Sequence, residues 1–207
     1  MSEYKAISDS DTLFNPTNHT YFNLNGFDGS NILNQEIQIF DDYYTWSNDA
    51  AIPDGRILPV EGTPMDLRKL TTIGRHIDAD FDELNYGHGY DHNWCINIVG
   101  NECISVLGSP LYRAAHAESK SSGIALTVHT DMPGIQFYTG NFLDGNLRGK
   151  NGVRFRHRQG FCLETQYYPN AVNNAKFPQP VLSGSIEWSS KTLYSIGRKL
   201  ETKISDE

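Results

Sequence analysis

Hydrophobic and polar residues alternate along much of the chain with a period of two residues, rather than with the helical period of 3.6. The segment Ala125 to Thr130 alternates in this way, which is the pattern of a half-buried strand. The same alternation is found at residues 36–40, 94–98 and 161–165, and shorter strand-like runs at 104–107, 135–138 and 192–196. Glycine, proline and aspartate residues separate these runs, as is typical of turns. The pattern predicts an all-β protein, built as a sandwich or barrel of many short strands.

The stretch from 60 to 92 departs from this alternation. Residues 67–77 and 80–84 are modest helix candidates. The rest of the stretch is polar, and we expect it to form a loop wall outside the hydrophobic core. Neither a repeat nor a linker-like segment divides the sequence, so we expect residues 1–207 to form a single domain.

Composition and charge narrow the class of protein. The chain has 207 residues, with 17 Lys and Arg against 25 Asp and Glu, and a formal charge of -8. An acidic chain repels phosphate backbones, so we expect no nucleic-acid partner. No apolar run approaches the ~20 residues of a membrane helix, and no secretory stretch opens the chain, so we expect no membrane association. The three cysteines lie at no metal spacing, which favours reduced thiols in a cytoplasmic protein.

The first candidate for chemistry is a segment in which polar and aromatic side chains cluster around His19. Asn18, His19, Tyr21 and Phe22 lie within five residues, shortly after a proline. An imidazole can give or take a proton near neutral pH. A flat aromatic ring beside a polar donor also suits a sugar ring, which has an apolar face and hydroxyl edges. The alternative is a structural histidine that is hydrogen-bonded between strands.

The second candidate is Glu164, a carboxylate inside an apolar strand. Burying a carboxylate is unfavourable unless it is paired or used, and burial raises its pKa toward values that suit a general base. We expect its side chain to point away from the side occupied by Cys162. The alternative is a salt bridge with Arg156 or Arg158.

Two further segments carry polar groups that could bind a ligand. His88, Asp91 and His92 lie within five residues, which invites a metal interpretation, but the spacing and the flanking glycines favour a loop that offers Asp91 to a ligand hydroxyl. Gln136 lies in a short strand between turns and offers both a donor and an acceptor. The cluster of Arg154, Arg156 and Arg158 alternates like a strand, and we interpret it as a charged face rather than a phosphate site.

Taken in order, these segments resemble the aldose 1-epimerase (galactose mutarotase) family. The matching stretches are TNHTYFNL (17–24), YDHNW (90–94), PGIQFYTGN (133–141) and GFCLETQYYP (160–169), with weaker likeness at 177–178 and 192–194. The resemblance implies a galactose mutarotase-like β-supersandwich and a free aldohexose, such as glucose or galactose, as substrate. It implies Glu164 as the general base at the anomeric hydroxyl and His19 as the acid at the ring oxygen, without a metal or organic cofactor. Asp91 and Gln136 would bind sugar hydroxyls, with Asn18, Tyr21 and Phe22 beside them.

One departure from the family pattern limits the resemblance. The family has an additional N-terminal region with a sugar-binding Asn-Arg pair and a second active-site histidine, and no segment here looks like either. We therefore expect the C-terminal part of the sandwich, which forms a homo-oligomer or pairs with a complementing N-terminal polypeptide. Two other functions stay open: a sugar-binding protein without turnover, and an epimerase for hexose 6-phosphates.

Overall fold

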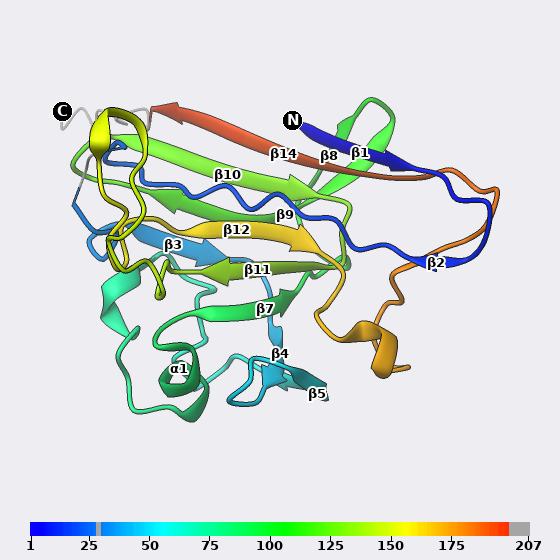
Figure 1. Cartoon of the computed structure of the whole chain (residues 1–207), viewed down its shortest axis with the longest axis horizontal. Helices are drawn as coiled ribbons and strands as arrows, with labels where there is room; N and C mark the ends of the chain where they lie inside the picture. Colours follow the sequence, from blue (N-terminus) through cyan, green and yellow to red (C-terminus); the bar gives the residue numbers. More distant parts are fainter. Residues whose placement is uncertain (28–29, 199–207) are drawn as a thin grey trace, which may run out of the picture.

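The computed structural model describes residues 1–27 and 30–198, and within them the regular secondary structure is almost entirely antiparallel β-strand, joined by long turns and loops (Figure 1). The larger sheet has the strand order β1 (Ser2–Ala6), β14 (Trp188–Arg198), β10 (Ile124–Thr130), β9 (Ser109–Glu118), β3 (Glu36–Ile39) and β6 (Thr71–Thr72), and β8 (Cys103–Val106) also pairs with β9. The second sheet has the order β12 (Cys162–Gln166), β11 (Gly134–Tyr138), β7 (Asp91–Cys95), β4 (Tyr43–Ser47) and β5 (Pro53–Pro59). The all-β prediction is confirmed.

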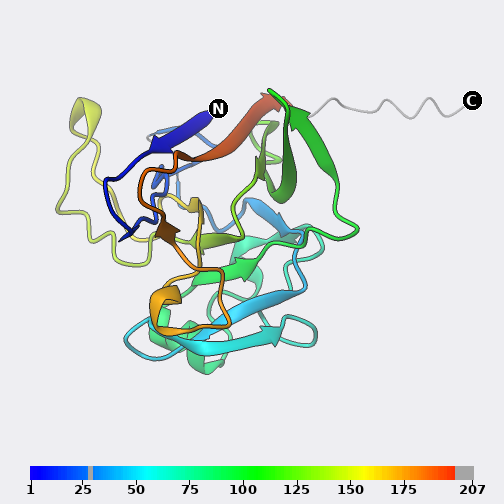
Figure 2. The ribbon, with the colours of Figure 1, turned by 90° about the vertical axis from the view of Figure 1, so that its right-hand side faces the viewer.

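Smaller elements connect the two sheets. β2 (Thr12–Leu13) pairs with β13 (Val181–Leu182). A short helix, α1 (Asp82–Gly87), precedes β7, and 3₁₀ turns occur at Ile73–Arg75, Lys150–Gly152 and Ala171–Asn173. Figure 2 shows the loop between β11 and β12 projecting to one side of the molecule. None of the described helices is long and apolar enough to cross a membrane.

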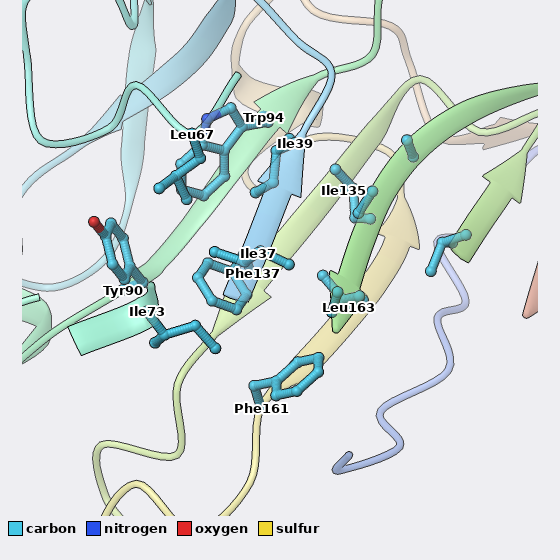
Figure 3. Packing of buried hydrophobic residues seen from close by; sticks show 14 of the residues in the cluster. Ile37, Ile39, Leu67, Ile73, Tyr90, Trp94, Ile135, Phe137, Phe161 and Leu163 are labelled. Carbon is cyan, nitrogen blue, oxygen red and sulfur yellow. The ribbon is translucent and has the colours of Figure 1, made fainter. Parts of the chain in front are cut away.

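The hydrophobic core lies between the sheets and is supplied by alternate residues of their strands. Ile135 and Phe137 of β11 and Leu163 of β12 are fully buried against Ile37 and Ile39 of β3 (Figure 3). Successive side chains of a strand point to opposite faces. The intervening residues of β11 and β12 must therefore point away from this core, and they form the site described below.

The expectation for residues 60–92 was wrong. The stretch supplies fully buried side chains to the core, including Val60, Met65, Leu67, Ile73 and Ile77. The predicted helix at 67–77 is instead β6 followed by a 3₁₀ turn, and the helix expected at 80–84 begins at Asp82. The buried residues follow a backbone that turns repeatedly, so they show neither strand nor helix periodicity. Irregular core of this kind cannot be recognised by periodicity.

Candidate functional site

The outer face of β7, β11 and β12 carries a row of polar side chains that is fixed by strand register. Gln136 lies opposite Glu164 on one side and opposite Asn93 on the other, while Tyr138 lies between Cys162 and Asp91. Directly opposed residues of an antiparallel pair share a face. Cys162 and Glu164 therefore point the same way, because they are two residues apart, and the expectation that they point to different sides was wrong.

His19 reaches this face on a segment that runs along the free edge of β12. The segment is held at one end by hydrogen bonds in both directions between Asn15 and the backbone of Tyr167, at 3.1 and 2.9 Å. At the other end, the backbones of Phe22 and Phe161 exchange hydrogen bonds of 2.7 and 2.9 Å. His19 lies between these two attachments, which place its ring over the polar face.

The central contact of the site joins His19 to Glu164. The Nε2 atom of His19 is 3.4 Å from Oε1 of Glu164, and the carboxylate side chain is only 9% exposed while the imidazole is 51% exposed. The Nδ1 atom of His19 is 3.4 Å from Sγ of Cys162. Arg158 instead forms an ion pair with Asp78, through contacts of 2.6 and 2.9 Å, so the alternative salt bridge between Glu164 and Arg158 is excluded.

Burial sets the protonation behaviour of Glu164. Desolvation raises its pKa to about 7, although His19 lowers it, and the negative charge of Asp91 raises it further. Near neutral pH the carboxylate therefore gains and releases a proton with almost equal ease, which is the property that a general base and acid requires. Burial also raises the pKa of Tyr21 to about 12 and raises the pKa of Tyr138, so both phenols are neutral hydroxyl groups.

Asp91 and Gln136 form a hydrogen-bonded pair beside Glu164. The Nε2 atom of Gln136 donates to Oδ1 of Asp91 at 2.7 Å. Burial raises the pKa of Asp91, while this hydrogen bond and His19 lower it. The Oε1 atom of Gln136 and the Oδ1 atom of Asn93 are buried and have no hydrogen-bond partner among the described residues. Buried acceptors without donors are unfavourable, so each of these atoms has unused hydrogen-bonding capacity at the polar face.

The amino-acid sequence matches a known protein family along almost its whole length. The profile of the family described as aldose 1-epimerase matches residues 2–195. The chain belongs to this family. It is 42% identical over 191 residues to a galactose mutarotase of Homo sapiens, covering 92% of this chain and 52% of that protein. It is 34% identical over 193 residues to an aldose 1-epimerase of Escherichia coli (strain K12), covering 92% and 53%.

Solved structures confirm the mutarotase-like fold. An aldose epimerase homologue from C. elegans superposes with a TM-score of 0.78 at 25% identity, covering 95% of this chain and 55% of that one. A galactose 1-epimerase from Lactobacillus acidophilus gives a TM-score of 0.76 at 27% identity, with coverages of 95% and 52%. The chain spans about half the length of the curated relatives that it matches.

Two residues predicted for the site of this aldose 1-epimerase family member lie away from Glu164. The Oδ1 atom of Asn18 accepts hydrogen bonds from the backbone and hydroxyl of Thr20, so its side chain shapes the turn that carries His19. Phe22 points to the core side, where its ring packs against Phe161 and Tyr194. Tyr21, in contrast, lies beside His19 with ring centroids 5.1 Å apart.

The segment that offers Asp91 is not the loop that we expected, because Asp91–Cys95 form β7, and the side chains of His88, Asp91 and His92 point in different directions. His92 points into the protein, edge-on to Trp94, and burial lowers its pKa to about 4. His88 is exposed at the end of α1, and Asp91 faces the opposite side of the strand. Elsewhere among the described residues, donor atoms of His19, Cys162 and Glu164 lie within 4.8 Å of one another. The shortest contacts in this group use different imidazole nitrogens, Nδ1 toward Sγ of Cys162 and Nε2 toward Oε1 of Glu164.

An apolar cavity of about 550 Å³ adjoins the site at Tyr21. Its other lining residues come from the segment after Tyr21 and from the projecting loop: Phe22, Asn23, Phe27, Leu143, Leu147, Phe155, Gln159 and Gly160. Phe27 and Leu147 are largely exposed. Arg154 and Arg156 are exposed at alternate positions, as expected for a charged face, whereas Arg158 leaves this pattern because it is buried against Asp78 in a turn with φ of 56°.

Sequence analysis missed Asn93, Tyr138 and Cys162 as neighbours of the acid and base. Each lies within a matched motif, but only the strand register shows that Asn93, which is on a different strand, lies beside Gln136. Gly134 supports this arrangement, because a Cβ atom there would lie 2.5 Å from Oδ1 of Asn93. Counting alternate positions outward from Glu164 and Gln136 would have identified Cys162 and Tyr138.

Proposed function

We propose that this chain carries the acid and base of an aldose 1-epimerase, which interconverts the α and β anomers of a free aldohexose such as glucose or galactose. The observation that carries the proposal is the 3.4 Å contact between a buried carboxylate, Glu164, and an exposed imidazole, His19, on a polar sheet face. Membership of the family and the names of its relatives support the reaction class.

The proposed reaction needs two proton transfers. The Glu164 carboxylate takes the proton of the anomeric hydroxyl, whose oxygen forms the carbonyl as the bond from C1 to the ring oxygen breaks. The ring oxygen takes the bonding pair and a proton from Nε2 of His19. Rotation about the bond from C1 to C2 exposes the other carbonyl face, and reversed transfers close the ring. Each positioned group would contribute about 10²–10⁴-fold to the rate.

The neighbouring groups hold the sugar against this pair in the proposal. Asp91 accepts a hydroxyl proton, while Gln136 and Asn93 offer the acceptor oxygens that have no partner among the described residues. Tyr21 supplies a flat, neutral ring next to His19. Asn18 and Phe22 support this wall, one through the turn at Thr20 and the other through the core.

Polarimetry with the Glu164→Gln variant tests the proposal. Freshly dissolved α-D-glucose and α-D-galactose relax spontaneously, and the wild-type chain should accelerate this relaxation. Glu164→Gln keeps the shape but removes the base, so the acceleration should fall by about 10²–10⁴-fold. Glu83→Gln is the matched control, because Glu83 is also buried but hydrogen-bonds to Tyr44 at a different place in the fold. Equal rates for wild type and Glu164→Gln would refute the assignment of the base.

We propose that a second chain completes the site. The basis is the exposure of His19 and Tyr21 and the apolar cavity beside them. The second chain is either another copy or a polypeptide that corresponds to the rest of the relatives. Light scattering at micromolar concentrations should show self-association in the first case, and a monomer that binds no such polypeptide would refute both.

The cytoplasmic location also stays a prediction, based on three free thiols.

A further inference from the structure

A small polar cavity lies between the pair formed by Asp91 and Gln136 and the strand β4. Its volume is about 10 Å³, and both side chains line it, together with Asn93 of β7 and with Thr45 and Ser47 of β4. One water molecule requires roughly 10–15 Å³ of such space, so the cavity accommodates a single oxygen atom with its hydrogens and nothing larger. It shares no lining residue with the apolar cavity described above.

Four neighbouring strands each contribute one polar side chain to a line that crosses the sheet at this cavity. Gln136 of β11 lies opposite Glu164 of β12 on one side and opposite Asn93 of β7 on the other. The Nδ2 atom of Asn93 donates to Oγ1 of Thr45 at 3.5 Å, which extends the line to β4. Neighbouring strands lie about 4.8 Å apart, and one water can bridge them because each of its hydrogen bonds is about 2.8 Å long.

Two of the side chains that line the cavity carry buried acceptors. Asn93 is only 2% exposed, and its Oδ1 atom has no hydrogen-bond partner among the described residues; the same is true of Oε1 of Gln136. The amide orientation of Gln136 is fixed because its Nε2 atom donates to the Asp91 carboxylate. Two acceptors cannot satisfy each other, and a sugar hydroxyl has one proton, which serves only one of them. A water has two protons and serves both.

We propose that the cavity holds one structural water, which donates to Oδ1 of Asn93 and Oε1 of Gln136, and that Thr45 positions this water by donating to it. A hydroxyl that accepts a hydrogen bond, as Thr45 does from Asn93, still has its own proton to donate. Buried waters typically make about three hydrogen bonds, within a range of two to four, so these three partners leave one lone pair in use for a ligand.

The water makes β4 part of sugar binding, an inference that rests on the proposed function. Its remaining lone pair accepts a hydroxyl proton of the sugar that Asp91 and Gln136 hold. Three strand spacings, about 14 Å, separate Thr45 from Glu164, which is more than the width of one hexose ring. Thr45 therefore acts on the sugar through the water, and the water in turn connects the acceptors of Gln136 and Asn93 to the sugar.

Crystal structures of the ligand-free chain, at a resolution that shows ordered water, give the direct test. The wild type should contain one water within about 2.7–3.2 Å of Oδ1 of Asn93, Oε1 of Gln136 and Oγ1 of Thr45. Thr45→Val keeps the shape but removes the donor, and should lose this water, whereas Thr45→Ser keeps the hydroxyl and should retain it. Thr71→Val is the matched control, because Thr71 is also buried but donates to the backbone of Lys69 in the other sheet.

Polarimetry at several concentrations of α-D-galactose provides the second readout on the same variants. Thr45→Val should raise KM about fivefold, the equivalent of one neutral hydrogen bond, and leave kcat within about twofold because the acid and base are untouched. Thr45→Ser should recover most of the wild-type KM, and Thr71→Val should leave KM unchanged. A merely structural role of Thr45 would lower the active fraction, and with it the apparent kcat, without changing KM.

The outcomes separate this inference from the proposed function. A wild-type crystal without the water would overturn the inference, and it decides the matter even if circular dichroism shows that Thr45→Val does not fold. A folded Thr45→Val variant that keeps either the water or the wild-type KM would overturn the role of Thr45. A galactose hydroxyl in the place of the water in a sugar-bound crystal would overturn the mediation. A Thr45-dependent water in a chain whose sugar relaxation ignores Glu164→Gln would support the water site and overturn the enzymatic assignment.

Discussion

The two faces of the β7–β11–β12 sheet bury their side chains to a similar extent but with opposite thermodynamic effects. On the inner face, Phe137 and Leu163 leave water entirely and stabilise the fold. On the outer face, Glu164 is almost as well buried, and desolvation raises its pKa, so its charged form destabilises the fold. The comparison teaches that one strand can supply stability and chemistry at alternate positions, and that the chemistry reduces the stability.

The largest expected effect comes from the inner face. Phe137→Ala removes a fully buried ring that packs against Tyr90, Trp94 and Phe161, and should lower the free energy of unfolding by about 3–5 kcal/mol. Urea unfolding followed by fluorescence measures the loss. Phe142→Ala, at an exposed ring in the projecting loop, is the matched control and should change stability little. Equal losses of stability in Phe137→Ala and Phe142→Ala would contradict the stabilising role assigned to the inner face.

Replacing the base should have the opposite effect on stability. The pKa of Glu164 rises from 4.5 to about 7 on folding, so the folded state binds the proton more tightly. The contribution of Glu164 to stability is therefore highest below pH ~4.5, is lost as the pH rises to ~7, and is lower by on the order of 3 kcal/mol above that pH. Glu164→Gln cannot ionise and should unfold at higher urea than wild type at pH ~8, with little difference at pH ~4. A variant that is less stable at pH ~8 would contradict the desolvation argument.

His92 should shift the pH dependence in the other direction. Burial lowers its pKa from 6.5 to about 4, so the unfolded chain binds the proton more tightly. Its contribution is fully present above pH ~6.5 and is lost as the pH falls to ~4, by about the same amount as for Glu164. The two effects nearly cancel between these limits in the wild type. His92→Gln should lose the acid-sensitive part, so its stability should fall with rising pH over the range where Glu164→Gln gains stability.

The smallest expected effect concerns ligand contact alone. Gln136→Ala removes the donor to Asp91 and the partnerless acceptor Oε1, and should raise KM about tenfold with a smaller change in kcat. Initial rates of sugar relaxation at several concentrations measure both constants. Gln38→Ala is the control, because Gln38 makes a similar amide contact, to Arg68, in the other sheet. A fall in kcat without a change in KM would assign Gln136 to the chemistry instead.

The sequence predicts some regions of the fold and the site better than others, for physical reasons. Alternation located β3, β10, β11 and β12 because each strand has one core face, and motif order placed His19, Glu164, Asp91 and Gln136. β4 was not predicted because its run begins with two adjacent tyrosines, of which Tyr43 is exposed and Tyr44 is buried, so residue type does not mark the core face there. The core residues of 60–92 lie on turns without a period. Asn93 depends on which strands pair, and pairing is a long-range property that a single sequence does not display.

The edge segment that carries His19 has a kinetic consequence. It is fastened to β12 at Asn15 and at Phe22, so it can bow only in the middle, where His19 lies. Excursions of such a short span take place in about nanoseconds to microseconds, while a typical enzyme turns over in about milliseconds to a second. In the proposed mechanism the imidazole would therefore sample the carboxylate and the sugar many times within each catalytic cycle. Movement of the acid would then not limit the rate, and no strand would have to leave the sheet for the proton to be delivered.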